Sequence, residues 1–158
     1  MLTGIDQGTN MMFSERGIEL TKDSEGFFPT PYICPAGYPT IGFGSRFYED
    51  GTEVTINDPP ITEEQATQLL YNTLVEYEEA VDRLVTVELT QGQYDCLVDF
   101  TYNVGINAFK SSTLLKLLNK GNYDGACNEL EKWTRGGGHT LPGLVKRRKK
   151  EQELFNEE

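Results

Sequence analysis

Glu25, Cys34 and Thr40 are the side chains of this sequence whose types and spacing could do chemistry. They lie in the stretch "SEGFFPTPYICPAGYPTIGFGS", residues 24–45. A carboxylic acid can donate a proton, and a thiolate can attack an electrophile or accept a proton. The stretch is therefore a candidate active site, provided that the local structure brings the three side chains together.

A short helix is predicted to carry Glu25. Ser14 is a typical N-cap residue, and Gly26 is a typical residue to end the helix. Ile18, Thr21 and Glu25 are three and four residues apart, so they share one face. Burial on that face and the negative end of the helix both favour the neutral acid, the form that a general acid requires. The alternative is a surface glutamate before a C-capping glycine.

Residues 29–56 alternate turn formers with short β-prone runs, which predicts a small antiparallel sheet with "EDGTEV" as its clearest hairpin turn. It is the only β-rich segment expected. A hairpin that starts at the end of the helix can fold back, so Glu25, Cys34 and Thr40 could face one cleft. The alternatives are a small buried hydrophobe for Cys34 and an ordinary strand residue for Thr40.

The rest of the chain is predicted to be helical, with short separators that favour a compact bundle. The expected helices are 62 to about 84, 90–103, 111–119, 123–134 and about 142–156. "RGGGHTLPG" separates the last two of them, and its first part, "RGGGHT", is expected to be a flexible loop. The fold class is therefore α+β, in one domain of 158 residues.

The charge and the cysteines exclude several classes of function. A net charge of −11 argues against non-specific nucleic-acid binding. Cys34, Cys96 and Cys127 are widely spaced, and the chain has one histidine, so no disulfide framework or metal site is expected. The start of the chain does not have the pattern of an export signal, and no stretch approaches the ~18 apolar residues of a membrane span.

Five consecutive basic residues, Lys146–Lys150, stand out in this acidic chain. Such a run is usually a solvated helix face. The alternative is a local patch that binds an anionic polymer.

Two other chemistries fit the sequence poorly. A cysteine hydrolase would need Cys34 as nucleophile and His139 as base, but no known nucleophile signature surrounds Cys34. "GFG" at residues 42–44 could begin a nucleotide loop, but Phe47 occupies the position of the third glycine and no parallel βαβ pattern follows.

The segment 25–44 resembles the active-site stretch of phage-type lysozymes, glycoside hydrolase family 24, which includes the T-even coliphage lysozymes. The shared pattern is a glutamate, eight residues, Asp or Cys, five residues, and a threonine inside "TIGxG". "DFTYNVGINAFKSSTLLKLLN" at 99–119 and "GLVKRRKKEQELF" at 143–155 look like the later helices of the family.

The resemblance implies a lysozyme-like α+β fold with a small sheet lobe and a larger helical lobe. Mapped onto this chain, the parts are a loose lead-in at 1–13, the active-site and sheet lobe at 14–60, a connecting helix at 61–85 and the helical lobe at 86–158. The implied activity is hydrolysis of the β-1,4 bond between N-acetylmuramic acid and N-acetylglucosamine in peptidoglycan, without a cofactor or metal.

The resemblance also assigns catalytic roles. Glu25 matches the general acid, Cys34 the position usually held by aspartate, and Thr40 the threonine that helps to hold the hydrolytic water. An ordinary thiol is mostly neutral at pH 7, and a nearby glutamate is expected to raise the pKa of Cys34 further. Direct attack by water and prior attack by Cys34 both remain open.

Rough alignment places Gly44, Tyr102 and Thr113 at substrate-binding positions lining the cleft, although surface or packing roles are equally expected for the last two. A second set of residues is expected in the core: Cys96, Phe100, Phe109, Cys127 and Trp133.

The implied biological role is that of a phage endolysin that lyses the host cell. Its partner would be bacterial peptidoglycan, with no nucleic acid, no stable membrane association and a monomeric state. It would start in the host cytoplasm and reach the periplasm and cell wall through a holin-type lesion. The alternatives are a virion-associated lysozyme and a catalytically silent peptidoglycan-binding module. The acidity of the chain is unexpected for an enzyme of anionic walls, and Lys146–Lys150 could supply the missing positive potential.

Overall fold

The computed structural model describes residues 11–157, which fall into two compact units. Unit 1 comprises the described residues of Met1–Leu20 together with Tyr77–Glu158, and unit 2 comprises Thr21–Glu76. The expected lead-in at 1–13 lies largely outside the described residues. The single-domain organisation with its internal boundaries stays a prediction.

Helix α1, Glu15–Glu25, has the predicted ends. The Ser14 hydroxyl accepts a hydrogen bond from the backbone N–H of Gly17 at 3.4 Å, as an N-cap does. At the other end, the Gly26 N–H donates to the Lys22 carbonyl at 2.9 Å, and Gly26 has a φ of 78°. A residue without a Cβ adopts this left-handed conformation at little cost, so the chain can leave the helix directly after Glu25.

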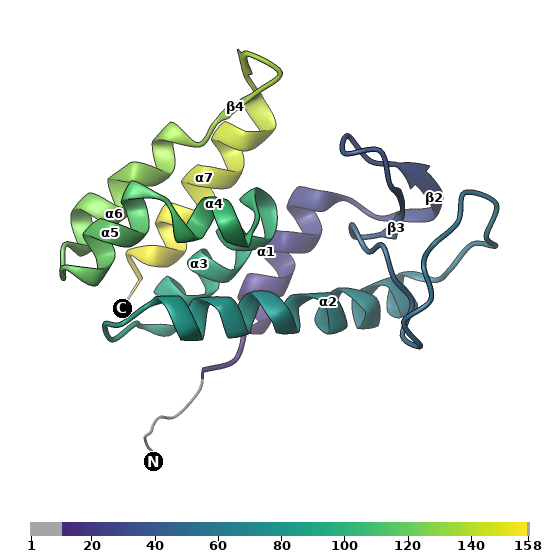
Figure 1. Cartoon of the computed structure of the whole chain (residues 1–158), viewed down its shortest axis with the longest axis horizontal. Coiled ribbons are helices and arrows are strands. Elements are labelled where there is room, and N and C mark those ends of the chain that lie inside the picture. Colours follow the sequence, from purple (N-terminus) through teal and green to yellow (C-terminus); the bar gives the residue numbers. More distant parts are fainter. Residues whose placement is uncertain (1–10, 158) are drawn as a thin grey trace. The chain divides into compact units, whose positions relative to one another are not determined.

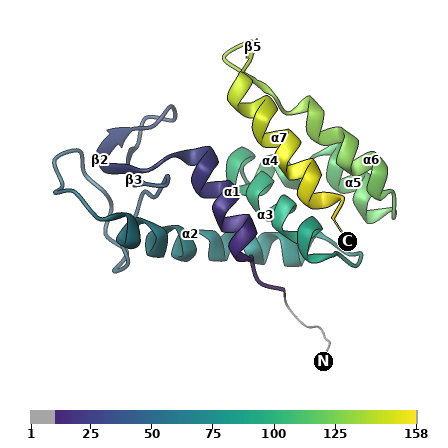
Figure 2. The same ribbon diagram turned by 180° about the vertical axis from the view of Figure 1, so that it is seen from behind.

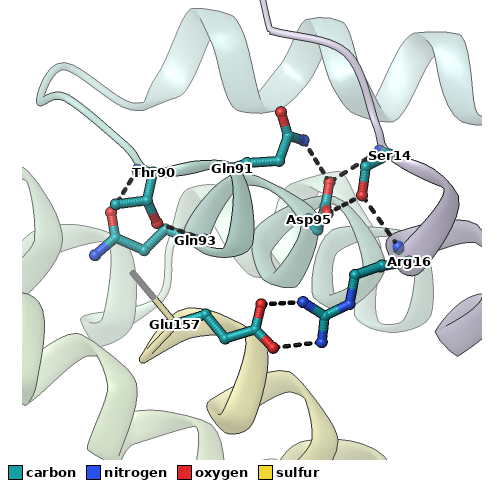
Figure 3. Close-up of polar contacts among 8 residues, drawn as sticks. Ser14, Arg16, Thr90, Gln91, Gln93, Asp95 and Glu157 are labelled. Carbon is teal, nitrogen blue, oxygen red and sulfur yellow. Dashed lines mark hydrogen bonds and ion pairs between the residues drawn. The ribbon is translucent and has the colours of Figure 1, made fainter.

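The first turn of α1 is held by α3, Gln91–Val104 (Figure 3). The Asp95 carboxylate accepts hydrogen bonds from the backbone N–H of Ser14 at 3.0 Å and from the Ser14 hydroxyl. The start of α3 is itself fixed by a capping box in which Thr90 and Gln93 bond reciprocally. Two capped helix ends therefore fix where α1 begins within unit 1.

Unit 2 contains the predicted antiparallel sheet, in a smaller form than expected. Strand β2, Phe28–Ile33, pairs with β3, Pro39–Gly42, and Tyr32 lies opposite Thr40. Beyond β3 the pairing is reduced to isolated bridges, one of which joins Phe47 to Glu53. "EDGTEV" is thus a closed turn rather than a hairpin of two strands.

Helix α2, Glu63–Leu84, confirms the prediction for this segment. Its first turn carries another capping box, since Thr62 and Gln65 exchange hydrogen bonds of 2.9 and 3.1 Å. The sheet contacts this helix at Gly42, where an added Cβ would lie 2.9 Å from the Cβ of Ala66. Gly42 of the "TIG" motif also has a φ of 70°. A glycine at this position therefore permits both the close contact with Ala66 and the left-handed backbone conformation.

The helices of unit 1 agree with most of the predicted ranges. They are α4 (Ile106–Lys110), α5 (Thr113–Asn119), α6 (Tyr123–Glu129), the 3-10 helix η1 (Leu130–Lys132) and α7 (Pro142–Phe155). Two predictions need correction: "NVGINAF" contains the short helix α4, and the segment 123–134 changes to a 3-10 turn before its end. Both views show α3 and α7 side by side (Figures 1 and 2).

The flexible loop expected at "RGGGHT" is instead a short β-ladder, so the sheet in unit 2 is not the only β structure. Strand β4, Arg135–Gly136, pairs with β5, His139–Thr140. Gly137 and Gly138 connect them with φ values of 58° and 83°. Two successive positive φ values match the right-handed twist of a hairpin, which is why the glycine run closes a tight turn here.

The core of unit 1 contains the predicted aromatic and cysteine residues. Cys96, Phe100 and Phe109 are fully buried, and Cys127 is nearly so. Trp133 is half-buried and lies edge-on to Phe100, with ring centroids 5.3 Å apart. No helix within residues 11–157 combines the length and the apolar composition needed to cross a membrane.

The prediction of a solvated basic run is wrong for Arg147 and Arg148, whose side chains are buried against α3. The Arg147 guanidinium donates two hydrogen bonds to the Asp99 carboxylate, Nε–Oδ2 at 3.0 Å and Nη2–Oδ1 at 2.8 Å. Arg148 bonds to Glu151 at 2.7 Å and to Asn103. Two of the five bases therefore pair with buried acidic side chains and are not available to bind a polymer.

Candidate active site

The loop after β2 holds Cys34 and Thr40 through one backbone carbonyl. The carbonyl oxygen of Tyr38 accepts a hydrogen bond from the Cys34 N–H at 3.0 Å and another from the Thr40 hydroxyl at 2.9 Å. The loop is closed by the Gly37 N–H, which donates to the Cys34 carbonyl at 2.8 Å. The structure therefore brings Cys34 and Thr40 together, as the spacing predicted.

The same loop changes the acidity of Cys34. Burial raises the pKa of the thiol, but hydrogen bonds from the Tyr38 backbone, the Thr40 side chain and the backbones of Ala36 and Gly37 lower it by more. The pKa of Cys34 thus lies below its ordinary value, and the expectation of a raised pKa is wrong. The expectation considered a neighbouring carboxylate and missed the donors of the loop, which favour the thiolate.

Tyr32 lies close to all three candidate residues, and the sequence pattern did not predict its part in the site. It lies on β2 directly opposite Thr40, so the two side chains share one face of the sheet. Burial raises the pKa of its phenol, and the charges of Glu25 and Cys34 raise it further. Its hydroxyl is thus within electrostatic range of both groups. Its place two residues before Cys34, in an alternating strand, was the available signal.

Glu25 occupies the last turn of α1 and is half-buried, in the same unit as Cys34 and Thr40. One turn earlier, the Lys22 ammonium lies 3.7 Å from the Glu63 carboxylate and 5.3 Å from the centre of the Phe43 ring. The sequence thus placed Glu25 correctly on its helix, and the neutral acid form stays a prediction.

The predicted substrate-binding residues are distributed over both units. Gly44 belongs to unit 2 and has a φ of 99°. Tyr102 lies on α3 in unit 1, edge-on to Tyr77 with ring centroids 5.2 Å apart, which is compatible with the packing role. Thr113 is the exposed first residue of α5. Their roles in binding stay predictions.

A metal site would need several grouped ligands, and a cysteine hydrolase would need a base beside Cys34. Across residues 11–157, no three His, Cys, Asp or Glu side chains are grouped so that they could hold a metal ion. His139 is exposed on β5, and the hydrogen bonds that lower the pKa of the Cys34 thiol come from Ala36, Gly37, Tyr38 and Thr40.

Selective alkylation tests the pKa order of the three cysteines. In the folded protein, Cys34 is expected to be the only one of the three cysteines that reacts with iodoacetamide. The midpoint of its reaction against pH should lie below that of an unstructured cysteine, because the thiolate is the nucleophile and the pKa of Cys34 is lowered. Burial raises the pKa of Cys96 and of Cys127, so both react only after unfolding. Mass spectrometry of tryptic peptides over a pH series measures this. A Cys34 midpoint that stays the same in denaturant, or earlier labelling of Cys96, would contradict the assignment.

The two-unit α+β architecture, with a carboxylate at a helix end and a thiol and hydroxyl on the adjoining hairpin, is of the lysozyme class. The family described as "Phage lysozyme" matches residues 22–151. The chain is 44% identical over 147 residues to the endolysin of Bacillus phage B103, covering 92% of this chain and 54% of that relative. It is 40% identical to the endolysin of Acyrthosiphon pisum secondary endosymbiont phage 1, covering 92% of this chain and 98% of the relative.

A solved structure agrees with the sequence relatives. The muramidase domain of SpmX from Asticaccaulis excentricus superposes with a TM-score of 0.83 at 35% identity, covering 93% of this chain and 99% of that domain. The chain belongs to the phage lysozyme family. The predicted family and the predicted α+β fold class are confirmed. The chain spans about half the length of the endolysin of Bacillus phage B103.

Proposed function

We propose that this member of the phage lysozyme family is an active lysozyme and acts as a phage endolysin, which cleaves the β-1,4 bond between N-acetylmuramic acid and N-acetylglucosamine in the bacterial cell wall. The observation that carries the proposal is the family match over residues 22–151, a range that includes Glu25, Cys34 and Thr40. Relatives named endolysin that match 92% of this chain support it.

Glu25 is the general acid. Its proton passes to the glycosidic oxygen as the bond from that oxygen to the anomeric carbon breaks, and the electron pair of the bond stays on the leaving sugar. The sugar that remains develops oxocarbenium character. Its half-buried place in the last turn of α1, in the same unit as Cys34 and Thr40, supports this role.

Cys34 and Thr40 act at the anomeric carbon, on the face of the sugar opposite the leaving group. A thiolate with a lowered pKa can accept a proton from water that the Thr40 hydroxyl orients, which inverts the anomeric configuration. It can alternatively attack the anomeric carbon, and hydrolysis of the thioglycoside then restores the configuration. The Thr40 hydroxyl has one proton, so a bond donated to the thiolate replaces the bond to the Tyr38 carbonyl.

Substitution of Cys34 tests this assignment. Cys34→Ala is expected to lower kcat on purified peptidoglycan by at least about 10²-fold, as loss of a positioned base does. Cys34→Asp is expected to retain most of the rate, because a carboxylate supplies the same charge at pH 7. Release of reducing ends gives the rates, and the anomer formed first, read by NMR, separates inversion from retention. An unchanged rate in Cys34→Ala would reduce Cys34 to a packing residue.

The proposal includes a cellular route and a physical state. The enzyme is made in the host cytoplasm, reaches the periplasm and wall through a holin-type lesion, and works as a monomer without nucleic acid or stable membrane association. A silent peptidoglycan-binding module would bind purified peptidoglycan without releasing reducing ends. A virion-associated lysozyme would be found in purified phage particles, and detection there would overturn the endolysin role.

A further inference from the structure

Arg46 is stacked on an exposed aromatic side chain beside the candidate active-site loop. Its guanidinium carbon lies 3.6 Å from the centre of the Tyr38 ring and 5.4 Å from that of Phe47. Tyr38 and Phe47 are 46% and 45% exposed, so the three side chains form a surface platform within unit 2. We call Tyr38, Arg46 and Phe47 the Arg46 platform.

The platform holds the uncompensated positive charge of a strongly acidic unit. Unit 2 has two basic residues, Lys22 and Arg46, against nine acidic ones. Lys22 is paired with Glu63, whereas within the described residues no carboxylate lies within 4 Å of Arg46. Because the Arg46 guanidinium is exposed and has no carboxylate partner among these residues, its charge is available to bind an anionic ligand.

The stack leaves the hydrogen-bonding edge of Arg46 available. A guanidinium that lies over a ring uses its flat face, while its N–H groups point outward in the plane. These donors form a fork that matches both oxygens of a carboxylate. The platform is therefore an exposed, oriented anion site, and its geometry selects a planar anion such as a carboxylate.

The backbone of Tyr38 links this site to the candidate catalytic residues. The Tyr38 carbonyl accepts the hydrogen bonds of Cys34 and Thr40, while the Tyr38 ring supports Arg46. A ligand bound at Arg46 is thus held next to the loop that carries the chemistry.

We propose that the Arg46 platform binds a carboxylate of the short peptide attached to N-acetylmuramic acid, and so positions the glycan at the active-site loop. This inference rests on the proposed function. The substrate carries these carboxylates at regular intervals, and the two buried arginines of the basic run, Arg147 and Arg148, cannot serve the same purpose. Arg46 thereby explains how an acidic lysozyme attaches to an anionic wall.

Chemical neutralisation of the wall tests the proposal. Hydrolysis is measured on native peptidoglycan and on peptidoglycan whose carboxylates have been converted to N-methylamides. Arg46→Gln is expected to raise KM on the native wall roughly three- to ten-fold, with kcat little changed, because it removes a charge-assisted bidentate contact. On the amidated wall the ratio of the wild-type and variant rates is expected to approach one. Arg46→Lys keeps the charge without the planar fork and should give an intermediate KM.

Lys149→Gln is the matched control, because it removes one exposed positive charge from α7. It should leave the ratio of native to amidated rates at the wild-type value. Two results would overturn the carboxylate site while the proposed function stands. One is that Arg46→Gln lowers the rate by the same factor on the native and the amidated wall. The other is that Lys149→Gln lowers the rate on the native wall as much as Arg46→Gln does. If the wild type releases no reducing ends from the native wall, the proposed function itself fails.

Discussion

Glu25→Gln is expected to lower kcat on purified peptidoglycan by about 10²- to 10⁴-fold, the range that general acid catalysis contributes. Glutamine keeps the shape of the side chain but has no acidic proton to give to the glycosidic oxygen. KM is expected to change little, because the contact with the sugar remains possible. Release of reducing ends under saturating substrate measures the effect.

Stability should move in the opposite direction to activity. Glu25 lies at the negative end of α1, so removing its charge is expected to stabilise the helix by about 0.3–1 kcal/mol where the carboxylate is ionised. Asp23→Asn is the matched control: it makes the same change in charge at an exposed position of the same turn and should keep full activity. Full activity in Glu25→Gln would exclude Glu25 as the acid.

Arg147→Met is expected to lower the free energy of unfolding by about 3–5 kcal/mol. The variant removes the opposite charge and two hydrogen bonds from the Asp99 carboxylate, which is fully buried. Denaturant unfolding followed by circular dichroism measures the loss. Lys149→Met, on the exposed side of α7, is the control and should stay within about 0.5 kcal/mol of wild type.

A double variant separates the contribution of the Asp99–Arg147 ion pair to stability from that of side-chain packing. Asp99→Leu combined with Arg147→Met should recover most of the loss, because an apolar pair of similar volume avoids the desolvation of both charges. A loss below about 1 kcal/mol for Arg147→Met alone would mean that water reaches Asp99, and that the ion pair contributes little.

Local sequence signals predicted the position of the candidate acid correctly. Ser14 and Gly26 cap α1 as expected, and their separation fixes Glu25 in its last turn. The alternation from Phe28 to Gly42 likewise predicted the sheet that carries Cys34 and Thr40. These features depend on interactions between residues close together in the chain, which a single sequence contains.

The basic run illustrates why other features could not be predicted. Five consecutive residues of a helix cover its whole circumference, so a packed helix must bury some of them. The buried residues of α7 are Arg147, Arg148, Glu151, Leu154 and Phe155, an amphipathic stripe in which charged residues occupy core positions. Sequence patterns expect charges outside, and the partner Asp99 is 48 residues away.

The sequence by itself determined the family, the α+β class and the order of Glu25, Cys34 and Thr40 along the chain, because capping, turn chemistry and motif spacing are local. The tertiary structure decided which charges are buried and how acidic each thiol is. It placed loop donors around Cys34 and lowered its pKa, and it stacked Arg46 on Tyr38. Burial and hydrogen bonding set those properties, and both depend on neighbours that the fold alone brings into contact.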